Sequence, residues 1–219
     1  MTAAEFRKTG KLLIVLSKIE MVDVSELLFS LPTVSGDGLP PIAPGTSKLG
    51  TDAIEISEDD WRQIEWLPRS IADAIEVELR SVMAIHEDER VEVGFAKCHL
   101  RSSLPNISPD REIRLSDLRE ALKPSATWLR GFAIQGIAGI AADSFAVRLL
   151  SSIELFGIAN DDKVQSICFG NTTANNAPEP DVQNLANFAV VHDLLLVDWC
   201  RVLALPAIHS EYVSYFTRA

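Results

Sequence analysis

The spacing of apolar residues changes along this chain, and that change restricts the fold more than any other feature of the sequence. Residues 58–86 repeat apolar side chains at the spacing of an amphipathic helix. Residues 144–169 alternate apolar and polar side chains with the period of two that is typical of a strand. We therefore expect an α+β fold: a mixed or antiparallel sheet with helices packed on it, in a single main domain.

The clearest local signal is a helix start. Ser57 followed by Asp60 has the form of a capping box, in which each residue satisfies a backbone N–H of the other. The pattern predicts a helix over 58–67. On that helix Trp61 aligns with the core face, whereas Trp66 is expected at the edge, covered by the preceding loop or left for a partner.

Three further elements follow from the pattern. An apolar stripe predicts a helix over 70–86. Residues 90–101 alternate as a strand does, with a phase change beside Gly94 that indicates a bulge. A short helix is expected over 116–122, before a proline.

Residues 126–158 fit two interpretations, because their apolar residues match one face of a helix about as well as a strand. Three glycines in 131–139 weaken a long helix. Asn160, Asp161 and Asp162 form a turn signal before another apolar run. We favour strand–turn–strand for 144–169.

The C-terminal part is expected to contain a helix, a strand and a second helix. Asp181 is expected to cap a helix over 182–191. Residues 194–205 then read as a buried strand interrupted by Asp198, and the tail around Tyr212 as a last short helix.

Proline and glycine divide the chain into three parts. Four prolines and four glycines fall within 32–53, which makes a regular element there weak. We interpret 1–31 as an N-terminal arm, 32–53 as a loop or linker, and 54–219 as the main α+β domain.

The charge is strongly acidic and uneven. The formal net charge is −11, and residues 51–90 contain twelve acids against four basic residues. Phosphate backbones require the opposite balance, so a nucleic-acid partner is not expected. An acidic face serves solubility, and it also suits a basic protein partner. Assembly into a homo-oligomer is left open.

No apolar run approaches the roughly twenty residues that cross a bilayer, so no membrane association is expected. The apolar run at 12–16 is too short for the hydrophobic part of a secretory signal. The cysteines are odd in number and widely spaced, which indicates reduced thiols in the cytoplasm rather than a disulfide framework. They are Cys98, Cys168 and Cys200.

Motifs that carry chemistry are missing. Gly131 and Gly136 have the spacing of a phosphate-binding loop, but Ile137 and Ala138 stand where lysine and serine or threonine are required. The histidines show no zinc-binding spacing. We expect no cofactor and no metal site.

Four residues remain as candidates for binding: Asp198, Trp199, His192 and Trp66. Asp198 stands in an apolar run, where a charge is costly unless it is paired or ends the strand. In the structural interpretation Asp198 turns the chain and its carboxylate is satisfied. In the functional one it lies at the mouth of a pocket beside Trp199, with His192 nearby.

Two hypotheses about function follow. The first is a non-enzymatic acidic interaction domain, immunity-like or adaptor-like, that binds a basic partner. The order of acidic helical part, strand, loop, helix and strand resembles, in class alone, that of small bacterial immunity and other interaction proteins. The alternative is a small-molecule-binding domain or enzyme with a pocket near Asp198 and Trp199.

Overall fold

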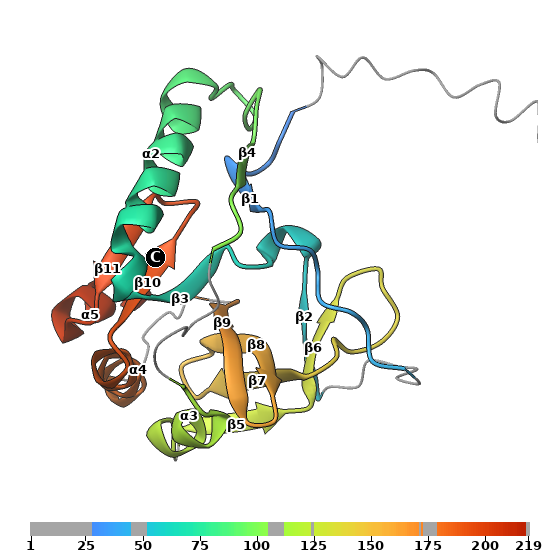
Figure 1. The fold of residues 1–219 in the computed structure, drawn as a ribbon, viewed down its shortest axis with the longest axis vertical. Helices are drawn as coiled ribbons and strands as arrows, with labels where there is room; N and C mark the ends of the chain where they lie inside the picture. The colour runs from blue at the N-terminus through green and yellow to red at the C-terminus, as the bar shows by residue number, and fades with distance from the viewer. Residues whose placement is uncertain are drawn as a thin grey trace, which may run out of the picture.

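The structure, a computed structural model, describes residues 28–44, 52–104, 112–123, 125–170, 172 and 179–217. A seven-stranded sheet in the order β11-β10-β3-β9-β8-β7-β5 forms its centre (Figure 1). All neighbouring strands of this sheet are antiparallel. The strands are β3 (Ile64–Pro68), β5 (Ala126–Leu129), β7 (Ser144–Leu149), β8 (Glu154–Asn160), β9 (Lys163–Phe169), β10 (Leu194–Asp198) and β11 (Leu203–Pro206).

Two short parallel pairs complete the strands: β1 (Thr33–Ser35) with β4 (His99–Arg101), and β2 (Ala53–Ile56) with β6 (Gly131–Ile134). The helical elements are η3 (Glu58–Asp60), η4 (Arg69–Ile71), α2 (Ala72–Asp88), α3 (Leu115–Ala121), α4 (Glu179–Val191) and α5 (His209–Thr217). Helices packed on a mainly antiparallel sheet confirm the predicted α+β class.

One face of the large sheet is closed by α3, α4 and α5. Strand β10 shows how, because alternate residues of a strand point to opposite faces. Leu194 and Leu196 join the core that contains Phe188 of α4 and Phe216 of α5. This core includes Trp66 and extends beneath α3.

The opposite face is covered in two separate parts. Helix α2 packs over β3 and β10, where Ile75 meets Leu67 and Val197. The β2–β6 pair packs over β7–β9, where Trp61 and Phe132 contact the sheet. In Figure 1, β3 lies between α2 above and α4 below, and β2 and β6 stand to the right.

The predicted helix over 58–67 is wrong beyond its first turn. The capping box of Ser57 and Asp60 forms, but the element it opens is the short η3. Arg62 then adopts a left-handed conformation with φ 58°, and the chain continues as β3. Trp66 is fully buried rather than at an edge. Residues of β3 are buried on both faces of the sheet, and such a run carries no period that separates strand from helix.

The predicted strand over 90–101 is also wrong in most of its length. Only His99–Arg101 forms a strand, β4, and Arg90 bridges Phe95 across a turn. Gly94 lies in that turn rather than in a bulge, with φ 93°. A Cβ there would stand 2.3 Å from the carbonyl oxygen of Phe29, so the close approach requires glycine.

Most other predicted elements are confirmed. Helices 70–86, 116–122 and 182–191 appear as α2, α3 and α4, and the tail forms α5. Residues 126–158 contain the strands β5, β6 and β7 and the start of β8, and 144–169 contains β7, β8 and β9, since residues 150–153 make an additional turn.

Two details at the C-terminal end need correction. The single strand predicted over 194–205 is the hairpin of β10 and β11. Asp181 lies inside α4 rather than before it, and its carboxylate accepts a hydrogen bond from the backbone of Ser151.

Residues 32–53, interpreted as a loop or linker, contain β1 and the first residue of β2. Residues 1–27 of the expected N-terminal arm lie outside the described residues. The division into arm, loop and main domain therefore stays a prediction.

Candidate functional site

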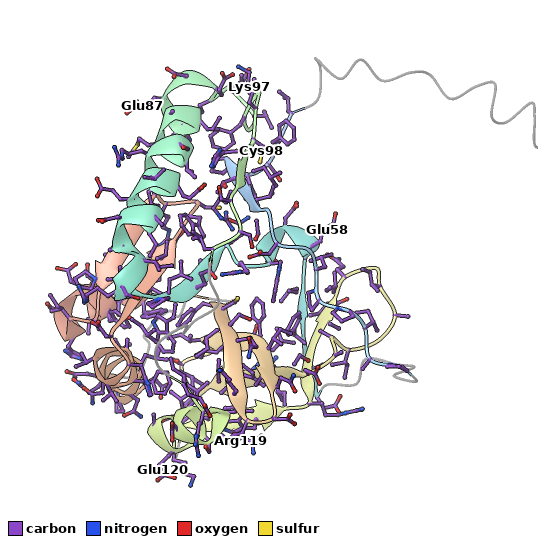
Figure 2. All side chains as sticks on the ribbon, in the orientation of Figure 1. Glu58, Glu87, Lys97, Cys98, Arg119 and Glu120 are labelled. Carbon is purple, nitrogen blue, oxygen red and sulfur yellow. The ribbon has the colours of Figure 1, made fainter. Side chains whose placement is uncertain are left out.

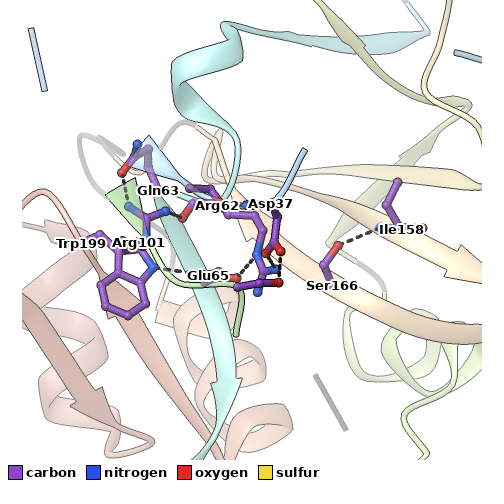
Figure 3. Close-up of polar contacts among 10 residues, drawn as sticks. Asp37, Arg62, Gln63, Glu65, Arg101, Ile158, Ser166 and Trp199 are labelled. Carbon is purple, nitrogen blue, oxygen red and sulfur yellow. Dashed lines mark hydrogen bonds and ion pairs between the residues drawn. The ribbon is translucent and has the colours of Figure 1, made fainter. Parts of the chain in front are cut away.

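A buried ionic cluster, formed by Asp37, Arg62, Glu65 and Arg101, lies between the two covered parts of the second sheet face. At its centre is Glu65 of β3, which pairs with Val197 of β10 and Cys168 of β9 and is 2% exposed. Its carboxylate accepts hydrogen bonds from Arg62 Nε at 2.7 Å and from Trp199 Nε1 at 2.9 Å (Figure 3). A charge this deep is tolerated because both oxygens have donors.

Arg62 connects this centre to the surface. Its Nη1 atom donates to one carboxylate oxygen of Asp37, whose second oxygen accepts from the Ser103 hydroxyl. Burial alone lowers the pKa of Arg62, but attraction to Glu65 and Asp37 outweighs burial, so the net pKa is raised. The ion pairs also hold the left-handed backbone at this residue, a conformation that costs about 1 kcal/mol or more outside glycine.

Arg101 of β4 is the fourth member of the cluster. It donates to the backbone oxygen of Arg62 at 2.7 Å and to Thr33 and Gln63 side chains at 3.1 and 3.2 Å. Its guanidinium lies 4.8 Å from the centre of the Trp199 ring. Burial lowers the pKa of Arg101 to about 10, which still leaves it charged at neutral pH. All of its described contacts are internal, so it is occupied in stabilising the fold.

A surface groove opens where the cluster reaches solvent. This η3 groove, of about 280 Å³, is lined by Val34, Asp37, Leu39, Glu58, Asp59 and Trp61, among others. Glu58 and Asp59 are exposed, and neither makes an ion pair with any described residue. Figure 2 shows Glu58 projecting from the turn that precedes β3. The groove therefore has a partly apolar wall and an acidic rim.

Trp61 lines this groove and has an unpaired polar atom. The residue is 6% exposed, yet its indole nitrogen has no hydrogen-bond partner. The ring stacks on Phe132 with centroids 5.6 Å apart and lies 6.3 Å from Phe156, and those two phenylalanine rings also contact each other. Buried polar groups are rarely left unpaired, so this donor needs a physical explanation.

Of the sequence-predicted residues, Asp198 ends β10, as the structural interpretation predicts. Its carboxylate accepts from the backbone N–H of Arg201 at 3.0 Å and from the Tyr215 hydroxyl at 2.7 Å. The neighbouring Trp199 is fully buried on the opposite face of the sheet, bonded to Glu65. Both side chains are thus engaged inside the fold, and nothing at either one favours the pocket alternative.

The other two candidates lie elsewhere. His192 precedes β10 at the end opposite to Asp198, and its ring centroid is 4.4 Å from that of Phe188. Trp66 packs on the same Phe188 at 5.4 Å and donates to the Tyr212 hydroxyl at 2.9 Å. His192 and Trp66 therefore both pack on Phe188, and neither lies beside Asp198. His192 also lines a cavity of about 520 Å³ between α3 and α4.

The thiols are poorly suited to catalysis. Burial raises the pKa of Cys98 and Cys168, and raises that of Cys200 to about 11. A nucleophilic cysteine needs the opposite shift. Among the described residues, no group of three or more histidine, cysteine or acidic side chains is placed to hold a metal ion.

Comparisons with known proteins find nothing similar: no family model, no curated protein and no solved structure matches the chain. Within the described part of the chain, no helix is both long and apolar enough to cross a membrane.

Sequence reasoning missed the ionic cluster and the η3 groove. Read as a helix, Arg62 and Glu65 stand three residues apart and form an ordinary exposed pair. The available signal was a charge inside an apolar stretch, Ile64 to Leu67, which is the same signal that singled out Asp198. Asp37 and Arg101 come from distant segments and carry no such mark.

Proposed function

We propose that this protein is a non-enzymatic, acidic interaction domain, immunity-like or adaptor-like, that binds a basic protein partner. The observation that carries the proposal is the exposed acidity of residues 52–89, which is left uncompensated. The exposed acids without an ion pair among the described residues are Glu55, Glu58, Asp59, Asp60, Asp73, Glu87 and Asp88. Complementary charge steers association and suppresses wrong partners.

The buried acids support the same proposal by contrast. Glu65 and Asp198 each have both carboxylate oxygens occupied by donors, so neither is free to act on a substrate. The three thiols have raised pKa values and are unpaired. Unpaired thiols suit a cytoplasmic protein, and we place its action there.

The free acids are spread over more than one surface, since Asp73 and Glu87 stand at opposite ends of α2 and Glu58 belongs to η3. Figure 2 shows Glu87 near the tip of α2 and Glu58 beside η3, well apart on the molecule. A single compact partner interface would use one of them. Neutralising each surface separately therefore identifies the one that binds.

The test is affinity capture with the full chain from a lysate of its source organism, followed by binding measurements with each purified partner. We expect a partner of net positive charge whose affinity falls steeply between about 0.1 and 1 M salt, as the Debye length shrinks from about 10 to 3 Å. The combined variant Glu58→Gln/Asp59→Asn/Glu87→Gln/Asp88→Asn should lose that partner. Partners that are acidic, or whose affinity is unaffected by salt and by this variant, would overturn the proposal.

A further inference from the structure

We infer that the cavity between α3 and α4 binds a small aromatic compound that carries a protonated amine. The inference goes beyond the proposed function and does not depend on it. It is carried by the size of the cavity, by its apolar and aromatic lining, and by the acidic side chains that α3 adds to that lining. In Figure 1 the two helices lie beside each other at the lower left.

The size and lining of the cavity are those of a small-molecule site. Its volume of about 520 Å³ falls within the roughly 300–1,000 Å³ of ordinary ligand sites. Phe188 of α4 lines the cavity and is only 3% exposed, so the cavity reaches the core beneath the two helices. Ala121 of α3 and Val191 of α4 add further apolar surface. An apolar lining with a few polar groups is typical of sites for organic ligands.

Aromatic rings in the lining favour a flat ligand. The Phe188 ring packs on Trp66 with centroids 5.4 Å apart, and the ring of His192 lies 4.4 Å from that of Phe188. Phe188 and His192 both line the cavity. Aromatic rings gain attraction from offset or edge-to-face packing on one another, so we expect the ligand to present a ring to this pair.

The charge of the lining sets the charge of the ligand. Asp117 and Glu120 stand one turn apart on the same face of α3, and both line the cavity. Asp117 makes no ion pair with any described residue, and Glu120 pairs with the exposed Lys123, a surface contact worth little. The neighbouring Arg119 lies over the Trp128 ring, 4.8 Å from its centre. A protonated amine is the group that suits these carboxylates.

Two amide side chains of α4 can bind a further polar group. The side chain of Asn184 is half-buried and makes no hydrogen bond with the described residues. Asn187, one turn later, accepts from Gln183 at 2.7 Å and keeps its own N–H donors. Both residues line the cavity. A hydroxyl on the ligand ring can therefore bond to α4 while the amine contacts α3.

The experiment uses the full chain and three probes. Tyramine has the amine, the ring and the hydroxyl; 3-(4-hydroxyphenyl)propanoic acid keeps the ring and hydroxyl but is an anion; butylamine keeps the amine and lacks the ring. Binding is followed by heteronuclear NMR through the side-chain amide signals of Asn184, assigned from Asn184→Ala. We expect tyramine to shift these signals saturably with a Kd of about 1 mM or less. The acid and butylamine should each bind at least about fivefold more weakly.

A matched pair of neighbouring valines locates the site. Val191 is 69% exposed and lines the cavity, whereas Val190 is 60% exposed and is not among the lining residues. Val191→Arg places a cation and a longer side chain at the cavity and should weaken tyramine binding at least about tenfold, and Val190→Arg less than about threefold. Both substitutions are at exposed positions, so both should leave the melting temperature nearly unchanged. Asp117→Asn/Glu120→Gln should also weaken binding about tenfold, which tests the carboxylates directly.

Each other outcome counts against the inference. Equal binding of tyramine and of the acid would show that the carboxylates do not select the ligand. Equal losses in Val191→Arg and Val190→Arg would place the binding outside this cavity. If tyramine does not bind, the small-molecule site is overturned, and loss of a captured protein partner in Val191→Arg would then assign the cavity to that partner. The salt-dependent capture described above decides the proposed function separately, whatever tyramine does.

Discussion

The two faces of the seven-stranded sheet are closed in different ways. On one face α3, α4 and α5 seal an apolar core, and its buried tryptophan, Trp66, bonds to the neutral hydroxyl of Tyr212. On the other face α2 and the β2–β6 pair each cover part of the sheet, and the ionic cluster fills the space between them. There the fully buried Trp199 bonds to the carboxylate of Glu65.

This difference shows what each kind of cover requires. Amphipathic helices bring continuous apolar stripes, and on this face the buried carboxylates stand at the ends of elements, Asp198 at the end of β10 and Asp181 in the first turn of α4. On the second face, segments that contain Asp37, Arg62 and Arg101 meet at the junction, and each brings a polar group out of water. Such groups are stable only as a complete set, because removing one leaves another buried and unpaired.

The largest effect is expected from breaking that set. Glu65→Gln keeps the size of the side chain and an acceptor for Trp199, but it removes the charge that faces buried Arg62. We expect a loss of about 3–5 kcal/mol in the free energy of unfolding, measured by urea denaturation. The control is Arg62→Met/Glu65→Gln, which removes both charges of this ion pair and should be less destabilised than Glu65→Gln alone. A double variant that loses the sum of both single losses would show that the two charges are not coupled.

On the apolar face we expect a somewhat smaller loss in the free energy of unfolding, caused by a cavity rather than by an unpaired charge. Leu196→Ala opens a cavity beneath α4 and α5 at a fully buried position, and should cost about 3 kcal/mol. The loss should be the same at low and high salt, unlike an effect that acts through charge. Leu100→Ala is the control, since Leu100 is 66% exposed and its removal should cost less than about 0.5 kcal/mol. A salt-dependent loss at Leu196 would contradict the comparison of the two faces.

The two faces also differ in how far the sequence could predict them. Helices α2, α3, α4 and α5 and strands β7–β9 follow from periodicity, because each buries one stripe or one alternating set of residues. The strand β3 is buried on both faces, so its pattern fits a helix as well, and the error at 58–67 follows from that. The satisfied Asp198 could be predicted from the cost of a charge in an apolar run. The ionic cluster and the η3 groove could not, because their members meet only through long-range pairing of β1 with β4 and of β3 with its neighbours.

Asp198 is a buried carboxylate at the margin of the helix-covered face. Asp198→Ala leaves the Tyr215 hydroxyl and the Arg201 backbone N–H without their acceptor, and should lower the free energy of unfolding by about 1–3 kcal/mol. Asp198→Asn retains an acceptor and should lose less. Thermal melts compare the three proteins. An unchanged melting temperature in Asp198→Ala would contradict the structural role and reopen the pocket alternative.

The smallest effect is expected at the pair that attaches α2 to β4. Glu78 accepts from His99 Nε2 at 2.7 Å, and its side chain is 10% exposed. Burial raises the pKa of Glu78, but hydrogen bonds from His99 and Ser102 outweigh burial, so the net pKa is lowered. A carboxyl whose folded pKa lies below its unfolded value of about 4.3 stabilises the fold above that pH, and the contribution is lost as the pH falls through the folded pKa. Glu78→Gln should therefore cost about 1 kcal/mol at neutral pH, and the difference from the natural protein should shrink as the pH is lowered below about 4. Urea denaturation at a series of pH values measures this difference. A gap that stays constant down to acid pH would show that Glu78 stabilises the junction by packing rather than by its charge.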